Sequence, residues 1–223
     1  DESKLHPQKY IPTWVGAHPS LGERVASTLF ESCQKQEITI PGIPSITKIK
    51  SQVTISNGTR VDFLLEQGES SKPRIVEVKT VVDTDYNSRW ELPVRSKCVF
   101  REQVQPYQRT AIFPWGQSNQ IGPNGEKVVS ARAIKHVREL TSLVEGGSYD
   151  ATVLFIVIRG DAEKFRPNHE ACPSFCSYLK QAEAKRVQLL VKRVQWGLGN
   201  QDRGECYDDT WIDIEWPKIH EDD

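Results

Sequence analysis

The feature that most constrains the fold of this chain is a run of three short strands joined by two tight turns. Residues 46–56 alternate apolar and polar side chains, which is the pattern of a half-buried strand. Asn57-Gly58 is a strong hairpin-turn dipeptide, and residues 60–66 follow it as a second strand. A turn rich in Gly and Ser then leads to a third strand over residues 75–82. The sequence therefore predicts a three-stranded meander.

Further elements flank the meander on both sides. They are a helix over residues 21–34 before it and, after it, a helix over 128–145, a continuous apolar strand over 151–158, a helix over 173–184 and a strand over 187–195. Ser20 and Glu23 have the spacing of a capping box at the start of the first helix. This order predicts an α/β (α+β) fold with a mixed central sheet flanked by helices.

Three charged side chains interrupt the apolar strands of the meander. Glu77 and Lys79 are two residues apart and share one face of their strand, and Asp62 lies on the neighbouring strand. Burying them costs several kcal/mol unless a partner compensates their charge. Mg²⁺ or Mn²⁺ held by Asp62 and Glu77 would do so, with Lys79 orienting or deprotonating a water. The pattern predicts metal-dependent hydrolysis of a phosphodiester, to which Glu23 would add a third carboxylate.

An alternative reading places these charges outward on a half-exposed sheet, where Glu77 and Lys79 face water. A similar pair of readings applies to Arg132, Lys135 and His136 on the helix over residues 128–145. They are expected either to contact a phosphate backbone or to form a solvated helical face. Arg60, which precedes Asp62 by two positions, is a further candidate for nucleic-acid binding.

The distribution of charge is more informative than the net charge of −1. Residues 200–223 hold nine acidic and two basic residues, so the rest of the chain is mildly basic. Such a body with an acidic tail fits a nucleic-acid partner, DNA ahead of RNA, although a solvated surface with a disordered acidic end also explains it. We expect an extended lead-in over residues 1–13, one domain over 14–199 with an insertion over about 83–127, and an acidic tail.

The five cysteines match no zinc spacing and are odd in number, which favours reduced thiols in an intracellular, reducing compartment. No stretch approaches the roughly 18 apolar residues that span a bilayer, so no membrane association is expected. The chain has no methionine and begins at Asp1, so further residues are expected to precede it.

The ordered motifs resemble the C-terminal domain of the sugar fermentation stimulation protein (SfsA) family. The matching segments are residues 59–66, with Arg-Val-Asp-Phe-Leu-Leu, 76–79, with Glu-Val-Lys, 113–114, 132–140, with Lys-His and Glu-Leu, 154–159 and 165–168. The match runs from about Trp14 to Val194, and the motifs are specific only in combination.

This resemblance implies a PD-(D/E)xK, restriction-endonuclease-like core and binding to DNA. This chain retains the three residues of the motif, Asp62, Glu77 and Lys79. Trp115 stands where the family has Asp, Ala133 replaces a helix glycine, and the insertion is longer than in bacterial forms. The OB-like domain of full-length bacterial forms is expected to be missing, because only about a dozen residues precede the match.

Three functional hypotheses follow. The first is a Mg²⁺- or Mn²⁺-dependent nuclease acting on DNA or RNA. The second is a regulatory protein that binds DNA and retains the fold without cleaving. The third is an interaction protein that uses the acidic, Trp-containing tail. The sequence does not separate DNA from RNA and does not indicate an oligomeric state.

Overall fold

The computed structural model describes residues 13–55, 58–68, 71–85, 108–116, 119–197 and 205–216. Its elements, in chain order, are α1 (Leu21–Gln34), β1 (Lys48–Thr54), β2 (Arg60–Glu66), β3 (Arg74–Val81), β4 (Thr110–Phe113), β5 (Gln120–Ile121), β6 (Lys127–Val128), α2 (Ala131–Glu145), β7 (Asp150–Val157), β8 (Lys164–Pro167), α3 (Pro173–Ala184), β9 (Gln188–Trp196) and β10 (Cys206–Trp211).

Within these residues, six strands form one mixed sheet in the order β1-β2-β3-β7-β9-β10. The predicted meander is its first half, because β1, β2 and β3 pair antiparallel. β3 then pairs parallel with β7, and β7 pairs parallel with β9. β3 is therefore the strand at which the sheet changes from antiparallel to parallel pairing.

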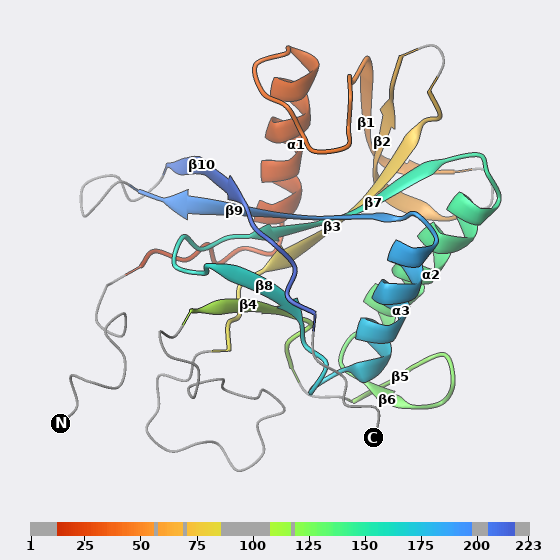
Figure 1. Cartoon of the computed structure of the whole chain (residues 1–223), viewed down its shortest axis with the longest axis vertical. Coiled ribbons are helices and arrows are strands. Elements are labelled where there is room, and N and C mark those ends of the chain that lie inside the picture. The colour runs from red at the N-terminus through yellow and green to blue at the C-terminus, as the bar shows by residue number, and fades with distance from the viewer. Residues whose placement is uncertain are drawn as a thin grey trace.

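Helices cover both faces of the sheet, as Figure 1 shows. α1 packs on one face through Ala26, Leu29 and Phe30, while α2 and α3 pack on the other. β7 lies between these two cores, and its side chains alternate between them: Phe155 belongs to the core under α2 and α3, and Leu154 to the core under α1. Burial on both faces explains its continuous apolar sequence.

The start of α1 lies unusually close to β3. A Cβ at Gly22 would come within 2.2 Å of Thr80 Oγ1 and 3.3 Å of Thr80 Cα, so only glycine fits there. The predicted capping box does not form, because Ser20 makes no side-chain cap; its Oγ bonds His18 Nδ1 at 2.8 Å instead. Glu23 is consequently free to point toward the sheet.

The segment predicted as an insertion contains regular structure. β4 pairs parallel with β8 in a small separate sheet, and β5 and β6 form a short hairpin immediately before α2. Most of the remaining insertion, residues 86–107, lies outside the described residues. The predicted Asn57-Gly58 turn is also only partly described, since Asn57 falls outside the described residues.

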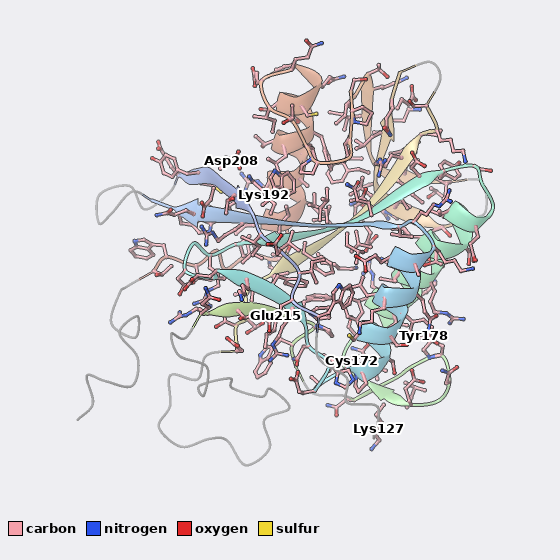
Figure 2. The ribbon with its side chains drawn as sticks, in the orientation of Figure 1. Lys127, Cys172, Tyr178, Lys192, Asp208 and Glu215 are labelled. Carbon is pink, nitrogen blue, oxygen red and sulfur yellow. The ribbon has the colours of Figure 1, made fainter. Side chains whose placement is uncertain are left out.

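Part of the segment predicted as an acidic tail forms an edge strand of the sheet. β10 pairs antiparallel with β9. Its acidic side chains meet basic partners on β9: Asp208 pairs with Lys192, and Asp209 with Arg193. Figure 2 shows the first pair, in which Lys192 is 3% exposed and also lies over the Trp211 ring, 4.9 Å from its centroid. Two ion pairs with β9 therefore compensate acidic side chains of β10 and stabilise its pairing in the sheet.

The four cysteines in the described part of the chain carry free thiols, and Cys98 lies outside it. Among the described residues, no helix combines the length and apolar character needed to cross a membrane.

Candidate active site

The site forms where β2 and β3 separate. Their paired register ends with Phe63 opposite Val76, and one step further Asp62 would face Glu77. Instead of bonding to the β2 backbone, the N–H of Val78 donates to Asp62 Oδ2 at 2.8 Å. The gap between the strands is thus closed by a carboxylate. Asp62 stands beside β3, as the meander predicted.

The environment of Asp62 disfavours its charge. The pKa of its carboxyl is raised to about 6: burial is the largest cause, the charges of Glu77 and Glu23 add to it, and the Val78 hydrogen bond and Lys79 offset part of it. Two acidic residues from β3 and α1 therefore act electrostatically on Asp62. A divalent cation among them would relieve this repulsion.

Glu77 is the most buried member of the group, with 3% of its surface exposed. Its Oε1 accepts from Lys79 Nζ at 2.5 Å and also contacts His136 Nδ1. Burial would raise the pKa of Glu77, but the hydrogen bond from His136 and the charges of Lys79 and His136 outweigh it, so the pKa lies below its ordinary value. Glu77 is therefore held ionised in a buried position.

His136 reaches Glu77 because α2 packs on the same face of the sheet. Ala133, Ile134 and Val137 bury the inner side of α2, and His136 lies at the edge of this buried stripe with 14% of its side chain exposed. Arg132 Nε lies 3.5 Å from His136 Nε2, at the limit of a hydrogen bond. This arrangement is consistent with a proton on Nδ1 that is donated to Glu77.

A groove of about 460 Å³ opens beside His136, between the first turns of α2 and the β5–β6 hairpin. Its lining is basic and partly apolar, and consists of Ile121, Gly122, Pro123, Ala131, Arg132, Lys135, His136 and Arg138. Three of the predicted nucleic-acid-binding residues, Arg132, Lys135 and His136, thus share one groove. His136 differs from the expectation in that it also bonds a site carboxylate.

Glu23 and Arg60 are joined to the site by a residue that the sequence analysis did not single out. Gln52 Nε2 donates to Glu23 Oε2 at 2.9 Å and lies 3.4 Å from Asp62 Oδ1. Gln52 Oε1 accepts from Arg60 Nε at 3.1 Å. Arg60, predicted as a nucleic-acid contact, here supports this amide.

The donor set fits a hard divalent cation in its chemistry. Carboxylate oxygens are the ligands of Mg²⁺, Mn²⁺ and Ca²⁺, and Mg²⁺ is commonly held by one or two carboxylates with water completing its shell. Asp62 and Glu77 would be the ligands, with Glu23 as a third. The described residues contain no group of three or more His, Cys, Asp or Glu side chains already arranged around a cation position.

Two contacts of the site were missed from the sequence. The one between His136 and Glu77 depends on how α2 packs on the sheet, which no local pattern encodes. The placement of Gln52 follows from the β1–β2 register, in which Ser51 pairs with Phe63 and Val53 with Val61. A correct hairpin register would have placed Gln52 opposite Asp62.

Comparison with known proteins supports the resemblance seen in the motifs. The family model described as "Sugar fermentation stimulation protein RE domain" matches residues 127–200. The chain is 28% identical over 185 residues to the sugar fermentation stimulation protein homolog of Microcystis aeruginosa, covering 82% of this chain and 60% of that protein. The homolog of Desulfotalea psychrophila is 25% identical over 179 residues, with 80% and 58% covered. The chain thus spans about 60% of the length of these relatives.

A solved structure extends the comparison to the fold. SfsA of Pyrococcus furiosus, determined in complex with Ca²⁺, superposes with a TM-score of 0.56 at 20% sequence identity, covering 86% of this chain and 64% of that one. The predicted fold class, a mixed sheet flanked by helices in a nuclease-like fold, is confirmed. The resemblance predicted from the motifs is confirmed as well: this chain is similar to proteins of the sugar fermentation stimulation family and has the fold of SfsA.

Proposed function

We propose that the chain hydrolyses phosphodiester bonds of nucleic acid with the help of Mg²⁺ or Mn²⁺. The observation that carries the proposal is the cluster at the separation of β2 and β3, where Asp62, Glu77 and Lys79 meet in a largely buried site. The similar fold of Pyrococcus furiosus SfsA, whose structure was determined in complex with Ca²⁺, adds support for a divalent cation.

The roles follow from the contacts. Asp62 and Glu77 would hold the cation, and Glu23 would add a carboxylate from α1. When bound, the cation would polarise the phosphodiester and acidify a water. Lys79, which lies 2.5 Å from Glu77 Oε1, would then be placed to orient that water or to neutralise charge that develops on the phosphate.

The basic groove beside His136 gives the substrate a place to bind. Arg132, Lys135 and Arg138 line it, and Lys135 is well exposed, with 72% of its side chain accessible and only a 3.7 Å ion pair to Glu139. Basic side chains of this kind contact phosphates without reading sequence. Nucleic acid is therefore the proposed substrate, and DNA and RNA need to be compared directly.

The test is a cleavage assay on end-labelled DNA and RNA in EDTA and in Mg²⁺, Mn²⁺ or Ca²⁺. Cleavage is expected with Mg²⁺ or Mn²⁺ and not in EDTA. Glu77→Gln is expected to lower the rate at least about a hundredfold, because losing a metal ligand forfeits several kcal/mol of transition-state stabilisation. Glu145→Gln is the matched control, since Glu145 pairs with Lys185 on the surface. Metal-dependent cleavage that survives Glu77→Gln would refute the assignment.

A second candidate function, nucleic-acid binding without cleavage, is favoured by one observation. Oε1 of Glu77 is already engaged by Lys79 and His136, so binding a cation there requires these contacts to rearrange. This function predicts salt-dependent binding with no cleavage in any divalent ion. Lys135→Ala should then reduce the slope of the logarithm of the binding constant against the logarithm of the salt concentration (the salt slope) by about one unit. Lys185→Ala, which removes an exposed lysine outside the groove, should leave the slope unchanged.

A further inference from the structure

Gln52 adopts a backbone conformation that its residue type disfavours. It lies in the middle of β1 with φ of 52°, in the left-handed region that favours glycine. The residues on either side keep the regular register, since Ser51 pairs with Phe63 and Val53 with Val61. The distortion is therefore confined to the one position of β1 that lies opposite Asp62.

The side chain of Gln52 uses both ends of its amide on the site. The nitrogen donates to Glu23 Oε2 at 2.9 Å and lies 3.4 Å from Asp62 Oδ1, so it bridges carboxylates from α1 and β2. The oxygen accepts from Arg60 Nε at 3.1 Å, which fixes the amide in this orientation. An amide nitrogen offers two donors, and here both point at acidic groups.

Two carboxylates that face each other without a counter-charge repel and turn apart. Here one oxygen of Glu23 and one of Asp62 lie 2.9 Å and 3.4 Å from the same atom, Gln52 Nε2. The Gln52 amide offsets part of this repulsion without adding a charge that a cation would have to displace. Strained residues persist where the surroundings hold them, and such residues concentrate at functional sites.

We propose that Gln52 is a positioning residue that holds the carboxylates of Glu23 and Asp62 at a common place where a divalent cation binds. This inference rests on the proposed function, because it presumes that these carboxylates are cation ligands. It extends that function by assigning a role to a side chain outside the predicted acidic and basic set.

The experiment compares two glycine substitutions that relieve the same backbone strain. Gln52→Gly removes the strain together with the bridging amide. Gln36→Gly is the matched control, because Gln36 has φ of 63° after the end of α1, is exposed, and belongs to no site contact given above. Mn²⁺ affinity of the full chain is measured by titration calorimetry, and folding by circular dichroism and urea midpoint.

Gln52→Gly is expected to bind Mn²⁺ about tenfold more weakly. This is the lower end of the loss of metal affinity, about 10- to 100-fold, that follows removal of a group that orients metal ligands. Its urea midpoint should stay at or above that of the wild type because the strain is gone. Gln36→Gly should keep wild-type Mn²⁺ affinity. Should Gln52→Gly fail to fold, Gln52→Asn replaces it, since Asn tolerates the left-handed region but its amide is one methylene too short.

The possible failures are distinguishable. Wild-type Mn²⁺ affinity in a folded Gln52 variant overturns the role of Gln52 and leaves the metal site standing. An equal loss in Gln36→Gly overturns it too, because the effect would then come from the backbone change. Absence of any Mn²⁺ binding by the wild type removes the metal site of the proposed function, and with it the role of Gln52.

Discussion

Asp62 on β2 accepts a hydrogen bond from the backbone N–H of Val78 on β3, at the point where the two strands stop pairing. A carboxylate thereby substitutes for a backbone carbonyl, and this substitution brings an acidic group to the side of Glu77. The carboxyl of Asp62 is partly buried there, and its pKa is raised to about 6, mainly by this burial.

Asp62→Asn is expected to stabilise the metal-free protein at neutral and higher pH. Because the pKa of Asp62 in the folded chain, about 6, exceeds its ordinary value of 3.8, ionisation disfavours folding. In the wild type, the contribution of protonated Asp62 to the stability of the fold is fully present below about pH 4 and is lost as the pH rises through about 6. At about pH 8 the free energy of unfolding of the variant should exceed that of the wild type by about 1–2 kcal/mol, after discounting for partial exposure of Asp62.

Urea unfolding in EDTA at about pH 8 and about pH 5 checks this expectation. The Asn side chain keeps an oxygen for the Val78 N–H, so the hydrogen bond itself is retained. The gain should shrink at the lower pH, because Asp62 is largely protonated there in the wild type. A gain that does not change with pH would contradict the link to ionisation. Added Mn²⁺ should favour the wild type over the variant.

His136→Ala is expected to destabilise the fold by about 1–3 kcal/mol at neutral pH, because it removes a donor from a buried carboxylate. The pKa of Glu77 is lowered in the folded state, so its ionised form contributes stability above the ordinary value of 4.5. This contribution is lost as pH falls through the folded pKa. The difference between wild type and variant should therefore narrow in acid.

Lys135→Ala is the control for His136→Ala, because Lys135 directly precedes His136 on α2 and 72% of its side chain is exposed. It should alter the free energy of unfolding by less than about 0.5 kcal/mol. Chemical denaturation at a series of pH values gives both curves. Equal effects of the two substitutions at neutral pH would show that the imidazole does not stabilise Glu77.

Gly22→Ala is expected to lower both stability and cation affinity. The added Cβ would meet Thr80 Oγ1 at 2.2 Å and Thr80 Cα at 3.3 Å, so α1 must move away from β3. Overpacking of this kind costs about 1–3 kcal/mol. The same movement carries Glu23 away from Gln52, so Mn²⁺ binding should weaken in proportion.

Gly146→Ala tests whether the effect of Gly22→Ala is specific. Gly146 ends α2 with φ of −66°, and a Cβ there would make only ordinary contacts, with Ser142 O at 3.4 Å. Thermal unfolding and Mn²⁺ titration should both resemble the wild type. Full cation affinity in a destabilised Gly22→Ala protein would separate the packing of α1 from the site.

Elements with a strong period were predictable from the sequence. α1 and α3 begin and end where the apolar spacing places them, and β7 is the continuous apolar strand. β4, β8 and β10 were missed because short strands gain their stability from partners distant in sequence. In β10 the deciding partners are Lys192 and Arg193, which neutralise an acidic segment that by itself suggests a solvated tail.

The candidate site was predictable only where one hairpin defines it. Asp62, Glu77 and Lys79 belong to adjacent strands, so alternation along β2 and β3 brings them together. A two-residue turn at Asn57-Gly58 would shift the β1–β2 register by one residue from the observed one, in which Ile55 N bonds Thr59 O. The role of Gln52 was therefore not visible. His136 arrives from a separate element and needs the packing of α2 to reach Glu77.

The long connection between β3 and β7 affects the order in which the chain assembles. β1, β2 and β3 are neighbours in sequence and can pair early, whereas the parallel β3–β7 pairing must wait for a large loop to close. α2 lies within that loop. We therefore expect nascent chains to carry Glu77 hydrated and without its imidazole neighbour until a late step, so that refolding experiments would detect the two strand pairings with different kinetics.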